Sequence, residues 1–338
     1  MAVRLATRAP FDGGALIAFL ARRAVPGVEE VRGATYRRSL RLVHGAATVE
    51  LRATEPGVEV GAESGTRPAT GAGPATEAGA GSGPDVGVEA TITLDEPRDL
   101  DEAARGLRAL LDLDADPDAV RDALGRDELI GHLVRAAPGR RVAGHVDPHE
   151  LAVRAVLGQQ VSLAAAAGLA ARLVAEHGRP LARPSGTVTH LFPSARALAG
   201  LAPNRLPMPR GRAAALVALA GALASGDLVL DRGADRDEAW RGLLALPGIG
   251  PWTASYIAMR ALGDSDAFPA GDLGIRRALE RMGRRADPAA SERLAERWRP
   301  YRAYAAEHLW ASTPRPVATA RGGSGARVGA LAPGPATT

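Results

Sequence analysis

The sequence contains no cysteine and no lysine. Without cysteine the chain forms no disulfide, no thiolate zinc site and no cysteine-bound iron–sulfur cluster, and we expect a cytosolic protein. Because lysine is missing, all 42 basic residues are arginine, and with 38 acidic residues they give a net charge of +4. This balance permits a polyanionic partner without requiring one, since a GC-rich genome also enriches a protein in arginine.

Long apolar runs are also missing. The longest, Ala213 to Ser225, is shorter than the roughly 20 residues that cross a bilayer. It therefore predicts a buried helix. The apolar run from Ala15 to Ala21 is followed directly by two arginines and no small-residue cleavage site, so we expect neither a signal peptide nor a membrane partner.

The pattern of the chain predicts an α+β fold in two parts. In the first part, expected over residues 1–114, Val3–Pro10 and Gly87–Leu94 are predicted strands, and Ala34–Ala53 is a predicted strand pair around His44 and Gly45. Gly13–Ala24 and Asp99–Leu113 are predicted helices. Residues 61–84 are mostly small residues and predict a disordered insertion.

The second part, residues 115–312, is expected to be a two-lobed, all-α domain. Its pattern is wholly helical from Asp116, with breaks at 138–139, 178–186, 203–209 and 226–233. Proline, glycine and alanine then dominate residues 313–338, which predict a disordered tail.

A helix–hairpin–helix is predicted where Asp235–Leu246 and Trp252–Leu262 are joined by a very short turn. This hairpin comprises Leu246, Pro247, Gly248, Ile249 and Gly250. Its glycines expose backbone N–H groups at the start of the second helix, where the helix dipole favours an anion such as a phosphate. The hairpin carbonyls could hold a monovalent cation. The alternative is an ordinary helical turn anchored by Ile249.

Asp272 follows a glycine and precedes an amphipathic run, which is the usual setting of a helix N-cap. A second interpretation arises because eight of the twelve aromatic residues fall between positions 240 and 310. Trp240 and Trp298 are predicted core residues, whereas Trp252 and Tyr256, four residues apart, share one helical face. A phosphate-binding hairpin, a carboxylate and a slot of rings together suit an enzyme that flips a base out of duplex DNA.

In these motifs the chain resembles the helix–hairpin–helix DNA glycosylases, in particular the bacterial 3-methyladenine DNA glycosylase II type. The resemblance covers Val3 to Ser312 and is strongest in Pro10–Val31, Val146–Leu173, Leu246–Leu262 and Glu296–Trp310. It implies a small α+β domain and two helical lobes with the active site between them. It also implies damaged double-stranded DNA as the partner, no cofactor, no side-chain metal site and base excision repair as the function. The same resemblance implies a bacterial, cytoplasmic, nucleoid-associated protein, and we expect a monomer.

The resemblance also assigns site residues. It makes Asp272 the catalytic carboxylate, and it lines the base pocket with Trp252, Tyr256, Trp310 and Phe19. The side chain that fills the gap left by the flipped nucleotide falls on Gln159 or Gln160, where relatives often have leucine.

The chemistry is consistent with this assignment. Cleavage of an N-glycosidic bond builds positive charge on the sugar, which an ionised aspartate stabilises. Alkylated purines are already cationic, so they leave readily and suit aromatic faces. Members that also cut DNA use a lysine in the hairpin motif. This chain has Trp252 there and no lysine anywhere, so we predict hydrolysis without lyase activity.

Other features have simpler interpretations. His145 and His149 flank Asp147-Pro148, which looks like a helix start, so a metal site is not expected and Asp147 is a predicted cap. The arginines of Arg276–Arg285 could follow phosphates or form an exposed face. Two alternative functions remain open at this stage: a glycosylase for oxidised or deaminated bases, and a non-catalytic DNA-binding protein.

Overall fold

The computed structural model describes residues 1–53 and 86–313. The predicted insertion at 61–84, and the predicted tail beyond Thr313, lie outside the described residues.

The first part of the chain forms a five-stranded antiparallel sheet with the strand order β1-β5-β4-β3-β2. Its strands and helices are β1 (Ala2–Ala6), α1 (Gly13–Ala21), β2 (Glu29–Arg32), β3 (Thr35–Arg41), β4 (Ala46–Ala53), β5 (Gly87–Leu94) and α2 (Leu100–Leu111), with a 3-10 turn at Pro97–Asp99. The predicted strand pair is confirmed as β3 and β4, in which Arg41 lies opposite Ala46.

One face of this sheet is covered by α1 and α2. Leu16 and Leu20 of α1 and Leu107 of α2 are buried in the same apolar cluster as Val49 and Ile92 of the sheet. This packing fixes α1, which carries Phe19, against the sheet.

The second part is mainly helical, as predicted. Its helices are α3 (Pro117–Leu124), α4 (Gly131–Ala136), α5 (Pro148–Leu157), α6 (Leu163–His177), α7 (Ala195–Ala199), α8 (Arg210–Ser225), α9 (Arg236–Ala245), α10 (Pro251–Arg260), α11 (Leu273–Arg281), α12 (Pro288–Ala295) and α13 (Arg302–Ser312), with 3-10 turns at Pro203–Arg205 and Glu296–Trp298. Short polar side chains cap several helix starts by accepting backbone N–H groups: Asp116, Asp147, Ser162, Ser194, Asp235, Asp272 and Asp287. The caps predicted at Asp147 and Asp272 are thus confirmed.

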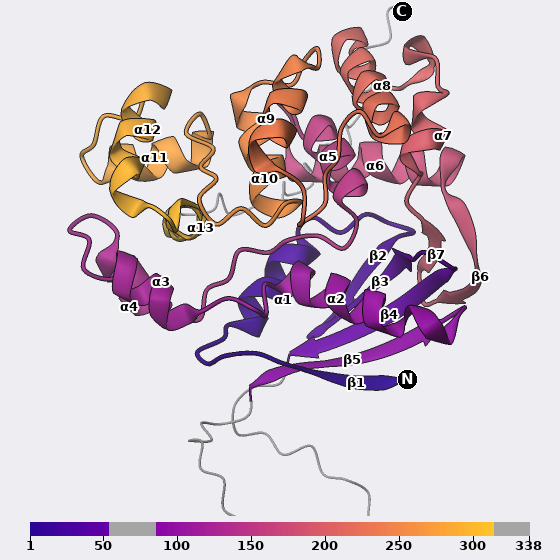
Figure 1. The fold of residues 1–338 in the computed structure, drawn as a ribbon, viewed down its shortest axis with the longest axis horizontal. Coiled ribbons are helices and arrows are strands. Elements are labelled where there is room, and N and C mark those ends of the chain that lie inside the picture. Colours follow the sequence, from indigo (N-terminus) through magenta and orange to yellow (C-terminus); the bar gives the residue numbers. More distant parts are fainter. Residues whose placement is uncertain (54–85, 314–338) are drawn as a thin grey trace, which may run out of the picture.

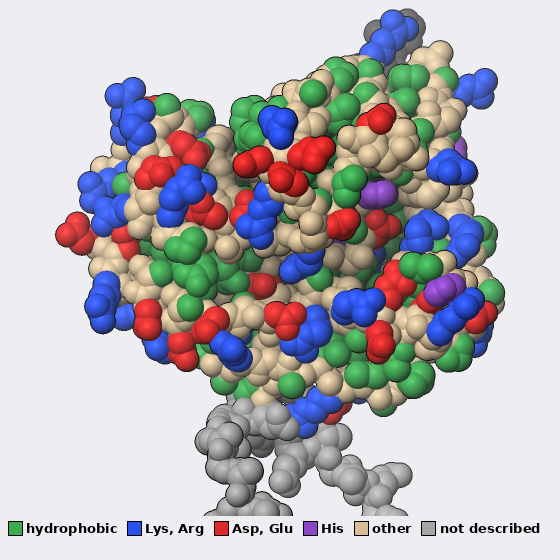
Figure 2. Space-filling view, viewed as in Figure 1, with side chains coloured by type: hydrophobic (Ala, Val, Ile, Leu, Met, Phe, Trp, Pro, Cys, Tyr) green, Lys and Arg blue, Asp and Glu red, His purple; other side chains and the backbone are tan. Residues whose placement is uncertain are grey.

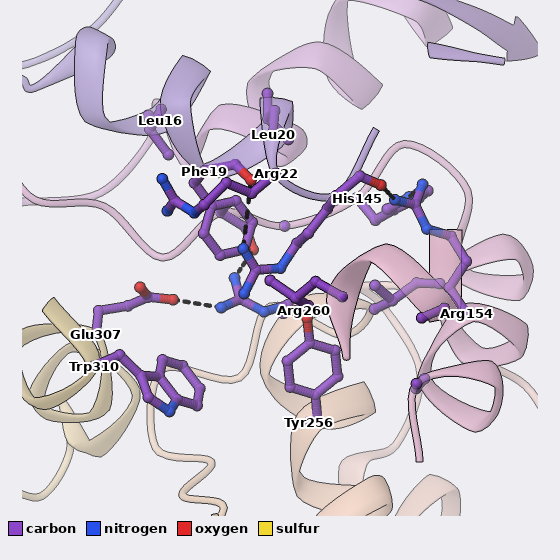
Figure 3. A pocket seen from close by; sticks show the side chains of 18 of the residues that line it. Leu16, Phe19, Leu20, Arg22, His145, Arg154, Tyr256, Arg260, Glu307 and Trp310 are labelled. Carbon is purple, nitrogen blue, oxygen red and sulfur yellow. Dashed lines mark hydrogen bonds and ion pairs between the residues drawn. The ribbon is translucent and has the colours of Figure 1, made fainter. Parts of the chain in front are cut away.

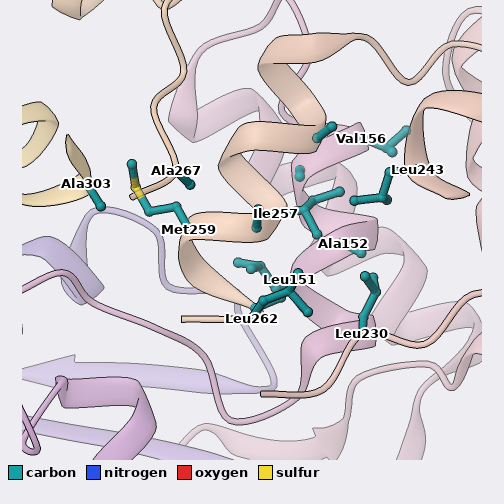
Figure 4. Packing of buried hydrophobic residues seen from close by; sticks show 14 of the residues in the cluster. Leu151, Ala152, Val156, Leu230, Leu243, Ile257, Met259, Leu262, Ala267 and Ala303 are labelled. Atoms are coloured by element: carbon teal, nitrogen blue, oxygen red, sulfur yellow. The ribbon is translucent and has the colours of Figure 1, made fainter. Parts of the chain in front are cut away.

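The helices form two groups above the sheet (Figure 1). The group α11–α13 lies on one side and α5–α8 on the other, with α9 and α10 between them. At the centre α5 packs against α8 and α10. Leu151 and Val156 of α5 and Ile257 of α10 belong to this core (Figure 4). This packing fixes α10, which carries Trp252 and Tyr256, in the middle of the molecule.

The prediction of an exclusively helical second part is wrong at one place. Residues after Gly178 form an antiparallel hairpin of β6 (Arg179–Ser185) and β7 (Val188–Leu191). The Gly27 carbonyl accepts N–H groups from Thr189 and His190 at 2.8 and 2.9 Å, and Ser39 of β3 donates to the His190 carbonyl at 2.7 Å. Tertiary contacts with the first part thus hold as strands a segment whose composition resembled a loop.

None of the helices in the described ranges is long and apolar enough to cross a membrane. On the face drawn in Figure 2, basic and acidic side chains are interspersed rather than gathered into one extended basic patch. This face therefore presents no extended basic surface to a polyanion.

Candidate active site

A cleft of about 750 Å³ lies where α1 of the first part meets α5, α6, α10 and α13 of the second. Its lining includes every residue predicted for the catalytic site and the base pocket: Phe19, Trp252, Tyr256, Asp272 and Trp310. These five residues are far apart in the sequence but line one cleft, part of which is seen in Figure 3.

The half-buried carboxylate of Asp272 accepts four hydrogen bonds. Its Oδ1 accepts the backbone N–H groups of Gly274 and Ile275 at 2.7 and 3.0 Å, and the indole N–H of Trp310 at 2.7 Å. Its Oδ2 accepts the indole N–H of Trp252 at 3.0 Å. Asp272 is therefore both the cap of α11 and a member of the cleft, which unites the two interpretations drawn from the sequence.

All four donors to Asp272 are neutral, and no arginine forms an ion pair with it in the described part of the chain. The donors fix the direction of the carboxylate without cancelling its charge. Oδ2 has a single partner, so it keeps more free lone pairs than Oδ1. The site therefore presents an oriented anion to the cleft.

The rings beside Asp272 form an aromatic wall. Trp252 and Tyr256 stack with centroids 5.6 Å apart and an angle of 14° between their planes. Both come from α10, as their spacing predicted, whereas Trp310 comes from α13 and Phe19 from α1. The indoles of Trp252 and Trp310 thus have two functions in the geometry, as donors to Asp272 and as walls of the hollow.

The hairpin lies at the start of α10. Gly248 has φ +77°, and a Cβ on it would lie 2.8 Å from the Cβ of Ala215, so glycine is required there. Ile249 is buried and anchors the turn, while a Cβ on Gly250 would meet nothing within 4 Å. Half-buried Leu246 and exposed Pro247 complete it. The open backbone at Gly250, at the N-terminus of α10, is the geometry that a phosphate needs.

The two glutamines after α5 differ in their surroundings. Gln159 donates from Nε2 to the Gly248 carbonyl at 2.9 Å and to the Thr253 hydroxyl at 3.0 Å, so it is tied to the hairpin. Arg212 donates to the Gln159 carbonyl at 2.5 Å. Gln160 is exposed and has φ +55°, a left-handed conformation that turns the chain sharply at this point.

Comparison with known proteins agrees with this geometry. Residues 2–147 match the AlkA N-terminal domain, and residues 153–302 match the HhH-GPD superfamily of base excision DNA repair proteins. DNA-3-methyladenine glycosylase 2 of Escherichia coli is 33% identical over 306 residues, which cover 89% of this chain and 94% of that relative. This chain belongs to the AlkA family of HhH-GPD proteins.

Two further comparisons concern the length of the chain and its fold. A Mycobacterium tuberculosis protein described as a probable bifunctional transcriptional activator/DNA repair enzyme AlkA is 45% identical over 317 residues, which cover 94% of this chain and 58% of that relative. This chain thus spans little more than half the length of that relative. A solved 3-methyladenine DNA-glycosylase from Archaeoglobus fulgidus shares the fold, with a TM-score of 0.70 at 21% identity over 92% of this chain and 97% of that one.

Three charged residues of this AlkA family site were not singled out from the sequence. They are Arg23, Arg260 and Glu307, all in the lining of the cleft. Although burial alone would raise it, the pKa of Tyr256 is lowered by the guanidinium groups of Arg260 and Arg23. Helical spacing could have indicated two of them. Arg260 follows Tyr256 by four residues and Glu307 precedes Trp310 by three, so each charged residue lies on the same face of its helix as an aromatic residue of the pocket.

A second group of charges lies elsewhere in the cleft wall and behind it. Arg38 donates to Glu150 at 2.8 Å and to Glu29 at 3.5 Å, and Arg154 donates to the same two carboxylates at 2.8 and 2.9 Å. Burial alone would raise the pKa of Glu29, but Arg154 and Arg38 lower it. Burial, followed by Arg38 and Arg154, lowers the pKa of the neighbouring His145 well below its ordinary value.

No group of three or more His, Asp or Glu side chains suited to a metal ion occurs in residues 1–53 and 86–313. The His145 Nδ1 accepts the backbone N–H of Asp147 at 3.1 Å, and Asp147 in turn accepts the backbone N–H groups of His149 and Glu150. These residues thus serve the start of α5.

Proposed function

We propose that this protein is a monofunctional DNA glycosylase that hydrolyses the N-glycosidic bond of alkylated bases flipped out of duplex DNA. The observation that carries the proposal is the Asp272 carboxylate, held by two indole and two backbone N–H groups beside an aromatic hollow. The names of the relatives in Escherichia coli and Mycobacterium tuberculosis support the same activity.

The chemistry requires an anion near the sugar. As the base leaves, positive charge develops on the deoxyribose, and a carboxylate whose direction is fixed in advance stabilises that charge without reorganising. In this proposal Oδ2 of Asp272 faces the sugar, since it has the single hydrogen bond from Trp252. Trp252, Tyr256 and Trp310 stack against the departing base, and water completes the hydrolysis.

The hairpin and Gln160 place the DNA in this proposal. The backbone at Leu246–Gly250 holds a phosphate and Gln160 enters the gap in the duplex, because it is exposed whereas Gln159 is tied to the hairpin. Phe19 supports the pocket from α1. A protein of this kind works as a monomer on chromosomal DNA in the cytoplasm, needs no cofactor and, since it has no lysine, leaves the abasic strand uncut.

The decisive experiment is Asp272→Asn. Asparagine remains a good N-cap, so the fold and DNA binding should persist, while base release under single-turnover conditions should fall by roughly 100- to 1000-fold. The substrates are duplexes containing 3-methyladenine, 7-methylguanine, hypoxanthine or uracil, and the released base identifies the substrate class.

The matched control is Asp287→Asn, which changes an aspartate that caps α12 and lies outside the cleft. It should release bases at the wild-type rate. A non-catalytic DNA-binding protein would show no base release in the wild type and equal DNA binding in all three proteins. Base release by Asp272→Asn at the wild-type rate would rule out the mechanism.

A further inference from the structure

The aromatic pocket already contains a cation of the protein itself. The guanidinium carbon of Arg260 lies 4.5 Å from the ring centroid of Phe19, 5.0 Å from that of Tyr256 and 5.5 Å from that of Trp310. The side chain of Arg260 is 1% exposed. In Figure 3 it lies between these rings, at the place where three different helices meet. Faces that would attract a cationic base are thus in contact with a resident positive charge.

Arg23 adds a second positive charge. Its guanidinium carbon lies 3.7 Å from the centroid of Phe19. The Phe19 ring therefore has two cations of the protein close to it, Arg23 just after α1 and Arg260 at the end of α10. With these two cations alone, the pocket would repel a base that arrives with a positive charge of its own.

Glu307 compensates the charge of Arg260. Its carboxylate accepts a hydrogen bond from Arg260 at 2.6 Å (Figure 3). The other terminal nitrogen of Arg260 donates to the Ala143 carbonyl at 2.6 Å. Glu307 itself lines the cleft and its side chain is 9% exposed. Arg23, Arg260, Glu307 and Asp272, which all line the cleft, carry two positive and two negative charges, so the charges of these four residues balance.

We propose that Glu307 is a specificity-determining residue, whose carboxylate offsets Arg260 and so allows a cationic N-alkylated purine to stack among rings that already surround a cation. The inference rests on the proposed function. It assigns to Glu307 a choice between bases of different charge, not a part in bond cleavage. The ion pair also joins α10 to α13, and a purely structural role would affect every base alike.

The test compares one cationic and one neutral base in the same duplex sequence. We would measure single-turnover release of 7-methylguanine and of hypoxanthine at one slightly acidic pH. Specificity is expressed as the rate for cationic 7-methylguanine divided by the rate for neutral hypoxanthine. A change of charge within the pocket acts on the charge of the cationic base, whereas the charge that develops on the sugar and any loss of packing are common to both substrates. The ratio therefore separates the charge of the base from packing.

Four variants should change the ratio in different directions. In Glu307→Gln the pocket gains net positive charge, and the ratio should fall by roughly tenfold or more. In Arg260→Gln it gains net negative charge, and the ratio should rise. The double variant restores the net charge of the wild-type pocket, so its ratio should return close to that of the wild type. The control Glu292→Gln, which changes a partner of Arg302 outside the cleft, should leave the ratio unchanged.

Folding is checked by thermal unfolding and by binding to an undamaged duplex, because each single variant leaves one buried charge without its partner. If Glu307→Gln does not fold, the rise in Arg260→Gln and the return in the double variant still decide the matter. Equal ratios in all folded variants would overturn the inference while leaving the glycosylase proposal intact. Release of neither base by the wild type would overturn both.

Discussion

Two kinds of charged group lie in and behind the cleft. In the wall formed with the sheet, Glu29, Arg38, Glu150 and Arg154 pair with one another, each carboxylate with both arginines. Beside the rings, Asp272 is held by four neutral N–H donors and has no cationic partner in the described residues. The first arrangement cancels charge, and the second directs it.

This difference indicates where each charge acts. A cancelled charge has little effect on a ligand, but its loss leaves a buried partner unpaired and destabilises the fold. An oriented, uncancelled charge contributes little to stability, but it acts on positive charge that develops nearby. Variants of the two groups should therefore separate stability from activity.

The largest effect on stability is expected for Arg38→Met. Arg38 is 1% exposed, and its removal leaves Glu29 and Glu150 sharing only Arg154, so the free energy of unfolding should fall by about 3–5 kcal/mol. Urea unfolding measures this loss. Base release per folded molecule should stay at the wild-type level, and a loss of activity at unchanged stability would contradict the comparison.

Arg52→Met is the matched control for this variant. Arg52 lies in β4 of the same sheet and pairs with Glu50, but its side chain is 63% exposed. Its substitution should change the free energy of unfolding by less than about 1 kcal/mol.

The next effect is expected for Trp252→Phe. Phenylalanine keeps a ring against Tyr256 but removes the N–H that donates to Oδ2 of Asp272. A hydrogen bond to a charged group contributes about 1.5–3 kcal/mol, so base release should slow by roughly 10- to 100-fold with little loss of stability. Trp240→Phe, on α9 and outside the cleft, should stay within about twofold of the wild type. Equal slowing in both variants would mean that the indole N–H is not what matters.

The smallest effect concerns pH and the paired charges. Because the pKa of His145 is lowered in the folded protein by burial, Arg38 and Arg154, the unfolded chain takes up a proton that the folded chain excludes. The contribution of neutral, buried His145 to the free energy of unfolding is fully present above the ordinary histidine pKa. It is lost as the pH falls below that value, by about 1.4 kcal/mol per pH unit.

His145→Asn should remove this part of the pH dependence, measured as the slope of the free energy of unfolding against pH between neutral and mildly acidic conditions. Its amide oxygen can still accept the Asp147 N–H, as Nδ1 does. His132→Asn, at an exposed position in α4, serves as the control. An unchanged slope in His145→Asn would show that another group is responsible.

Periodicity and turn residues predicted much of this fold. The strand pair of β3 and β4, the helices on either side of Pro247–Gly250 and the cap at Asp272 each depend on neighbours close in the sequence. The periodicity, the turn residues and the capping side chain all act on residues nearby in the sequence, so these elements can be predicted without knowing the rest of the molecule.

Contacts between distant segments could not be predicted in this way. The bond from Trp310 to Asp272 spans 38 residues and the pair of Arg260 and Glu307 spans 47, and helical spacing gives only the face of each helix, not its partner. The hairpin of β6 and β7 was missed for the same reason, since its strands are held by the Gly27 carbonyl and by Ser39. The functional roles assigned to the site residues stay predictions until the variants are measured.

The hairpin of β6 and β7 has a mechanical consequence. It extends from the helical part and is hydrogen-bonded to the first part through Gly27, before β2, and Ser39 of β3, while Arg41 donates to the Phe192 carbonyl at 2.6 Å. These hydrogen bonds hold the two parts together at this point and restrict their movement relative to one another. We therefore expect the cleft to keep a nearly constant width, so that a ligand has to move into it rather than be enclosed by it.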